Sequence, residues 1–155
     1  LDAEPQLFHP GDLDYIHSVE RISKFSNVIS INGGVQLDLM GQENAESTGT
    51  RQLSGVGGQM DFLEGAYRSK GGKGFICINS SRVTKDGERK SNILATIPGG
   101  STISAPRTMI QYVATEYGIA SLSGKTLRER AEAMASIAHP DFREELMKYA
   151  QENFK

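Results

Sequence analysis

Short apolar runs separated by helical patterns limit the fold of this chain more than any other feature. Four runs predict strands, at residues 27–33, 35–41, 74–80 and 91–97. Segments 99–107 and 109–118 add two extended stretches. Because helical spacing recurs between and after these runs, we predict an open α/β domain with a largely parallel or mixed sheet and flanking helices. The 155 residues fit one domain, residues 1–155, around a single core.

The helices have recognisable starts and stops. Apolar spacing predicts one helix ending at Asn27 and another from Gln59 to the glycines at 71 and 72. Thr126 and Glu129 have the spacing of a capping box, which predicts a helix over 126–138. Pro140 suits the first position of a last helix.

Two strands flank Gly33 and Gly34. Their spacing suggests a hairpin of 27–33 with 35–41, and the apolar density of the first strand predicts burial on both faces.

The composition limits the class of protein and the cellular compartment that we expect. Hydrophobic residues make up 37% and charged residues 23%, and no apolar stretch is long enough to cross a membrane. The N-terminus has no Met and no signal-peptide pattern, so we expect a chain cut from a longer one. Cys77 lies in an apolar run, which predicts a buried thiol in a reducing compartment, and a cytoplasmic location is expected.

Residues 68–90 are basic, although the whole chain carries a net charge of −2. Seven Lys and Arg side chains face one Asp and one Glu there. Such a stretch can bind phosphate, or it can be a solvated loop. Nucleic acid is disfavoured because the chain has no Trp and its basic residues are not interleaved with a set of aromatics that could stack on bases.

Several chemistries lack their motifs. Three scattered His and one Cys give no metal-ligand spacing, and neither GxSxG nor the Walker pattern occurs. The stretch GVGGQM fails the dinucleotide fingerprint, because Met60 stands at the third glycine position.

Three candidates remain. The stretch SGVGGQMDF places Gly57 and Gly58 before a helix, where backbone N–H groups can approach an anion, or where a tight turn is formed. Glu116 follows an apolar strand in TEYG and is either a site carboxylate at a strand end or a surface glutamate. Asn44 in GQENAES either donates to a ligand carbonyl or stabilises its own turn.

Four ordered motifs carry a family resemblance: INGGVQLDLMGQENAES, SGVGGQMDF, TEYGIASLSGKTLRERA and IAHPDFREEL. In this order they resemble the C-terminal domain of the acetyl-CoA hydrolase/transferase family, which includes 4-hydroxybutyrate and acetate CoA-transferases. The resemblance implies an open α/β fold of the CoA-transferase type and a longer parent enzyme.

The resemblance also implies a reaction. CoA would move between short-chain carboxylic acids through a glutamyl-CoA thioester, with the nucleophilic glutamate upstream of this chain, so the fragment alone would be inactive. Gly57 and Gly58 would face CoA and lie near the acyl oxygen, with Gly58 also in a supporting catalytic role. Asn44 would line the acyl site, Glu116 would orient the reacting groups, and Lys85 would meet CoA phosphates.

Acyl-CoA and a carboxylate are thus the expected substrates, and no metal or bound prosthetic group is called for. The missing N-terminal domain and a second copy of the chain are the expected partners. Two alternatives stay open: an acyl-CoA hydrolase, in which water resolves the intermediate, and a non-catalytic CoA- or nucleotide-binding module.

Overall fold

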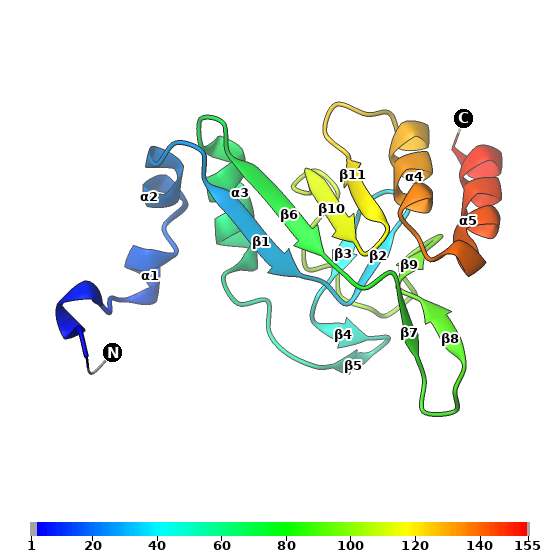
Figure 1. Cartoon of the computed structure of the whole chain (residues 1–155), viewed down its shortest axis with the longest axis horizontal. Helices are drawn as coiled ribbons and strands as arrows, with labels where there is room; N and C mark the ends of the chain where they lie inside the picture. The colour runs from blue at the N-terminus through cyan, green and yellow to red at the C-terminus, as the bar shows by residue number, and fades with distance from the viewer. Residues whose placement is uncertain (1–2, 155) are drawn as a thin grey trace.

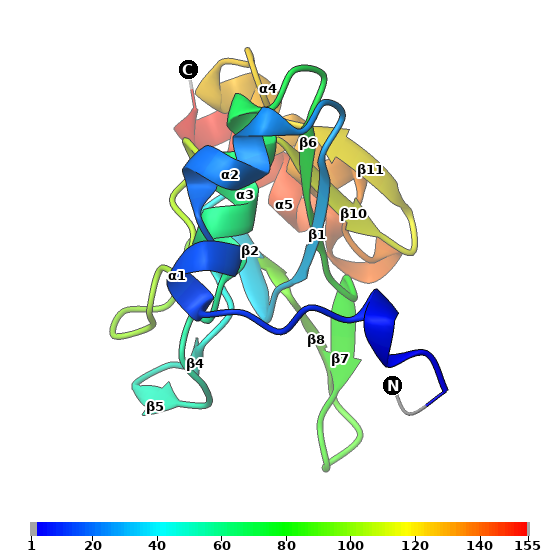
Figure 2. The same ribbon diagram turned by 90° about the vertical axis from the view of Figure 1, so that its left-hand side faces the viewer.

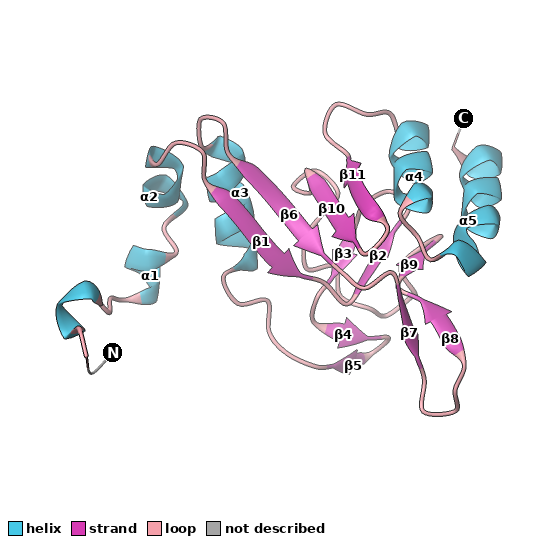
Figure 3. Cartoon of the chain, in the orientation of Figure 1, coloured by secondary structure: helices cyan, strands magenta, loops and turns pink. Residues whose placement is uncertain are grey.

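A four-stranded sheet forms the centre of the computed structural model, which describes residues 3–154 (Figures 1 and 3). Its strand order is β1-β6-β10-β11. The first three strands run parallel and β11 returns antiparallel beside β10. Their bounds are β1 Ile29–Gly33, β6 Lys73–Cys77, β10 Tyr112–Thr115 and β11 Gly118–Ser121. The expected α/β fold with a mixed sheet and flanking helices is confirmed.

Three small sheets lie beside the main one. The first has the order β3-β2-β9, and the other two are the hairpins β4-β5 and β7-β8. Their strands are β2 Gln36–Asp38, β3 Glu43–Asn44, β4 Ser47–Thr48, β5 Arg51–Gln52, β7 Ser81–Val83, β8 Arg89–Ser91 and β9 Ile93–Leu94. The predicted strand over 91–97 is therefore much shorter than expected, and segment 99–107 forms only an isolated bridge from Ala105 to Glu43.

Five α-helices and one 3-10 turn accompany the sheets in the described part of the chain. They are η1 Pro5–Leu7, α1 Leu13–Ile16, α2 Val19–Lys24, α3 Gln59–Arg68, α4 Leu127–Ser136 and α5 Pro140–Asn153. The capping box at Thr126 and the proline start of α5 are present as predicted. The first predicted helix is split in two, because Ser18 accepts a hydrogen bond from the N–H of Arg21 and caps a new start.

The predicted hairpin around Gly33 and Gly34 is wrong. β1 pairs with β6, whereas β2 pairs with β3 and β9 in another sheet. A two-residue hairpin needs positive φ in its loop, and neither glycine has it. The two glycines instead carry the chain from one sheet to the next.

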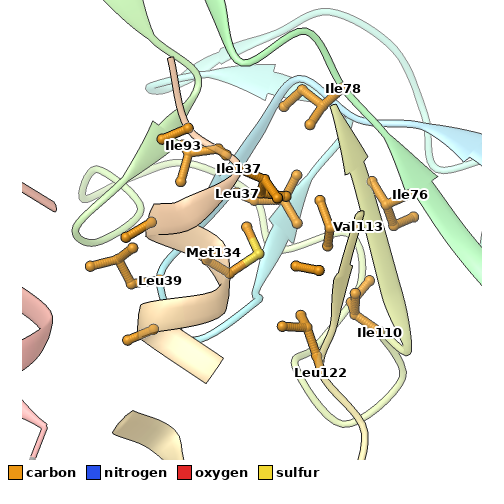
Figure 4. Close-up of a cluster of buried hydrophobic side chains, with 14 of the residues drawn as sticks. Leu37, Leu39, Ile76, Ile78, Ile93, Ile110, Val113, Leu122, Met134 and Ile137 are labelled. Carbon is orange, nitrogen blue, oxygen red and sulfur yellow. The ribbon is translucent and has the colours of Figure 1, made fainter. Parts of the chain in front are cut away.

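The core lies between the two larger sheets and α4 (Figure 4). Leu37, Ile76, Ile93, Val113 and Met134 are completely buried there, one from each of five elements. Helix α3 covers the same face of the main sheet, where Leu63 packs against Gly74. The core side chains thus come from segments far apart in the sequence.

The other face of the main sheet is open. Along β1, Ile29 and Ile31 are 51% and 69% exposed, so the expectation that this strand is buried on both faces is wrong. Cys77 on β6 is also exposed, and the prediction of a buried thiol is wrong as well. Both predictions assumed that a high density of apolar residues means burial on both faces. In β1 and β6, however, successive side chains alternate between a covered and an uncovered face.

Candidate functional site

A pocket of about 430 Å³ lies at the carboxyl ends of β6 and β10. It is lined by Gly34, Cys77, Ile78, Asn79, Ala114, Thr115 and Glu116. Since β1, β6 and β10 are parallel, they end at one edge of the sheet, which is where open α/β proteins bind their ligands. Figure 1 shows that α3 begins near this same edge.

Glu116 is held in this pocket by one partner residue. The Ser80 backbone N–H donates to its Oε2 at 2.9 Å, and the Ser80 hydroxyl donates to its Oε1 at 2.6 Å. Burial would raise the pKa of Glu116, but the hydrogen bonds from Ser80, together with the N–H of Glu116 itself and the charge of His139, outweigh it and hold the pKa below its usual value. The carboxylate is therefore ionised at neutral pH and fixed in direction.

Ser80 was missed by sequence reasoning. It is completely buried and ends the apolar run that contains β6. A small polar residue at the end of an apolar run that forms a parallel strand was the available signal.

The glycine turn precedes α3. Gly57 has a φ of +58°, which favours glycine, and Gly58 is the N-cap residue of α3 without a side-chain cap. A Cβ on Gly58 would clash with the imidazole of His17. The sequence predicted that some group comes close to the glycine backbone. In the structure, the group next to Gly58 is the side chain of His17.

His17 also faces acidic and aromatic neighbours. Its Nδ1 lies 3.5 Å from a carboxylate oxygen of Asp61, and its ring contacts Phe62 edge-on. The imidazole therefore sits between α1 and the first turn of α3.

A buried carboxyl group connects the glycine turn with the pocket. Glu43 is completely buried on β3, and Gln59 donates to its Oε2 at 2.7 Å. Its Oε1 has no hydrogen-bond partner among the described residues, and a Cβ on Gly34 would lie 3.1 Å from it. Burial raises the pKa of Glu43 to about 7, helped by the nearby charge of Glu46 and opposed by the Gln59 hydrogen bond. Sequence reasoning missed this pair.

Asn44 fixes its own loop. Its Oδ1 accepts from the N–H groups of Glu46 and Ser47 at 3.0 and 2.9 Å, and its Nδ2 donates to the Ser47 carbonyl at 2.8 Å. The side chain is completely buried. Of the two interpretations left open by the sequence, this geometry matches the turn.

Lys85 lies in the turn between β7 and β8 and is exposed. Four of the seven basic side chains of residues 68–90 lie in this hairpin. Lys90 contacts Glu88 at 3.1 Å there, and Arg82 donates to Asn92. The hairpin extends from the same edge of the sheet that carries the pocket (Figure 1). The structure therefore brings Glu116, Gly57 and Gly58 to one edge and leaves Lys85 on a projecting turn.

Residues 3–154 also bear on metal binding and on membrane crossing. No cluster of three His, Cys, Asp or Glu side chains in this range has the geometry to hold a metal ion. No helix in the same range is long and apolar enough to cross a membrane.

Residues 1–150 match the Acetyl-CoA hydrolase/transferase C-terminal domain family. The chain belongs to this family. Among relatives of this C-terminal domain, the butyryl-CoA:acetate CoA-transferase of Anaerostipes caccae is 46% identical over 151 residues, 97% of this chain and 34% of that protein. The 4-hydroxybutyrate coenzyme A transferase of Clostridium kluyveri is 48% identical over 142 residues, 92% of this chain and 32% of that protein.

The fold of this acetyl-CoA hydrolase/transferase C-terminal domain is also found in solved structures. RipA from Yersinia pestis matches with a TM-score of 0.78 and 40% identity, over 90% of this chain and 30% of that one. A more distant relative, the acetyl-CoA hydrolase of Kluyveromyces lactis, is 32% identical over 124 residues. The domain thus spans about a third of the length of the two CoA-transferases.

Proposed function

We propose that the full-length protein is a CoA-transferase that moves CoA between short-chain carboxylic acids, and that this chain is its C-terminal domain. The observation that carries the proposal is Glu116, ionised and fixed by Ser80 in a pocket at the carboxyl edge of a parallel sheet. Membership in the family, and the printed names of relatives 46% and 48% identical, support the same conclusion.

The proposed reaction has two steps for each substrate. A glutamate carboxylate upstream of this chain attacks the acyl-CoA thioester, which forms an acyl-glutamyl anhydride and releases the CoA thiolate. The thiolate then attacks the glutamyl carbonyl, expels the first carboxylate and leaves a glutamyl-CoA thioester. A second carboxylate reverses these steps and leaves as acyl-CoA, so atoms and charge balance.

The residues of this domain take supporting roles. The N–H groups around Gly57 and Gly58, uncapped by a side chain, would stabilise the negative oxygen of each tetrahedral intermediate. Glu116 would orient the reacting groups in the pocket. Asn44 would act indirectly by fixing the loop at the acyl site, and Lys85 would reach a CoA phosphate from its hairpin.

CoA transfer can be measured directly with the full-length protein. We expect acetyl-CoA to be converted to butyryl-CoA when butyrate is added, and a peptide upstream of this chain to gain the mass of CoA. Glu116→Gln should lower kcat by about 100-fold, since misplaced reacting groups cost that much. The exposed Glu152→Gln serves as the control and should leave turnover unchanged.

An acyl-CoA hydrolase is the second candidate, favoured by the relative from Kluyveromyces lactis. The two activities differ in whether water or a carboxylate resolves the thioester. If free CoA is released at the same rate with and without butyrate, and no butyryl-CoA is formed, the proposed transferase activity is wrong and the protein is a hydrolase. The absence of any CoA-bearing peptide would contradict the glutamyl mechanism in both.

A further inference from the structure

The open face of the main sheet carries a continuous set of apolar side chains. Strand alternation and register bring Ile29 and Ile31 of β1 beside Lys73 and Phe75 of β6, and Phe75 beside Tyr112 of β10. We call the apolar members of this set the open sheet face: Ile29, Ile31, Phe75, Cys77, Tyr112 and Ile119.

Within the described residues, Ile29, Ile31, Cys77 and Ile119 are exposed, and Phe75 and Tyr112 are half-buried. Ile31 is 69% exposed and Ile119 on β11 is 63% exposed, while Phe75 stacks on Tyr112 with ring centroids 4.9 Å apart. Figure 2 shows α2 and α3 together on one side of β1 and β6. That side is the covered face, because Gly74 faces Leu63 of α3 while Phe75 and Cys77 point to the other face. Apolar surface of this extent on a sheet is typical of an interface.

The open sheet face continues into the candidate pocket. Cys77 belongs to both, and Ala114, which pairs with Cys77, lines the pocket from β10. A body packed on this face would therefore close the pocket from one side. Glu116, the carboxylate of that pocket, is itself exposed in the domain as it stands.

We propose that the open sheet face is the docking surface for the N-terminal domain of the full-length protein, which completes the pocket beside Glu116. The choice of occupant rests on the proposed function, which requires an attacking carboxylate from upstream of this chain. In the Anaerostipes caccae enzyme, the matched domain makes up 34% of the protein, so about two thirds of that chain lies outside it. A covalently linked domain is present at high effective concentration, so it covers this face before a second copy does.

Cys77 provides the test, because it is the only Cys in the chain and lies on the open sheet face. The full-length protein is treated with N-ethylmaleimide, and the tryptic peptide of residues 74–82 is followed by mass spectrometry. We expect Cys77 to react at least about tenfold more slowly in the native protein than in the same protein unfolded in urea. A native rate close to the unfolded rate would overturn the docking proposal.

Charged substitutions on the open sheet face give a second test of the docking proposal. Ile31→Asp with Ile119→Asp should return the reaction of Cys77 towards the unfolded rate, whereas Val83→Asp, at a 59% exposed site on the β7-β8 hairpin, should not. Amide exchange of α4 checks that the variants remain folded. The wild-type comparison decides the proposal even if the double variant does not fold.

Two further outcomes separate the alternatives. Protection of Cys77 that disappears when an oligomer is diluted to monomers would mean that a second copy covers the face, and the proposal would be wrong. A protected Cys77 in a full-length protein that transfers no CoA would support the docking surface while overturning the proposed function.

Discussion

At the scale of single residues, Glu43 makes stability depend on pH. Its pKa is raised from 4.5 to about 7 by burial, so between these values the folded protein holds a proton that the unfolded chain has lost. The unfolding free energy therefore falls as pH rises through this window, by about 3 kcal/mol in all, and the loss is complete above pH 7.

Glu43→Gln removes this dependence while keeping an acceptor for Gln59. We expect the variant to gain about 3 kcal/mol relative to wild type between pH 4 and pH 8, measured by urea unfolding at each pH. Glu152→Gln, at an exposed site, should run parallel to wild type. Parallel curves for Glu43→Gln and wild type would show that Glu43 titrates normally.

Gly58 offers a second prediction at this scale. Its φ of −89° suits alanine, but a Cβ would displace the imidazole of His17 from its contact with Phe62. Gly58→Ala should lower the unfolding free energy by about 1 kcal/mol, and His17→Ala combined with it should recover most of that loss. If the double variant is as unstable as the sum of the two changes, the clash is not the reason for glycine at this position.

At the scale of elements, α4 is tied to three loops by one side chain. The guanidinium of Arg130 donates to the carbonyls of Met40, Leu122 and Arg107, each at 2.8 Å. Arg130→Met leaves the buried Leu122 carbonyl and the part-buried carbonyls of Met40 and Arg107 without this partner, and should cost roughly 3 kcal/mol in urea unfolding. The control is Arg128→Met on the same helix, whose exposed pair with Glu132 should cost less than about 0.5 kcal/mol.

The capping box at the start of α4 should contribute less to the unfolding free energy than Arg130 does. The Thr126 hydroxyl accepts from the N–H of Glu129, and the Glu129 carboxylate accepts from Thr126. Thr126→Ala should lower the unfolding free energy by about 1 kcal/mol. Thr126→Ser should lower it much less, because serine keeps the hydroxyl that accepts from Glu129. Equal losses for alanine and serine would rule out the cap as the cause.

Elements with local signals could be predicted from the sequence, and elements set by distant pairing could not. Thr126 with Glu129, and Pro140, determine helix starts within a few residues of themselves, so α4 and α5 were found. The partner of β1 is β6, far along the chain, and no local pattern distinguishes that pairing from a hairpin with β2. In the candidate site, the Ser80 and Glu116 pair depends on the same long-range register, so only Glu116 was identified.

At the scale of the whole molecule, one core joins both larger sheets and the C-terminal helices, while residues 3–16 contribute no buried side chain. Figure 1 shows this N-terminal segment standing away from the sheet. We expect amides of residues 3–16 to exchange hydrogen several orders of magnitude faster than those of β6, which pairs on both sides. Comparable protection in the two segments would show that the N-terminal segment is held by contacts not seen within this domain.

The parallel pairing of β1 with β6 also has a consequence for synthesis on the ribosome. Ile29 emerges well before Lys73, its neighbour in the sheet, and at about 5–20 residues per second the wait lasts several seconds. During that time Ile29 and Ile31 have neither a partner strand nor α3 beside them. A nascent chain in this state is a substrate for chaperones, and an upstream domain that is already folded would shelter the strand as it appears.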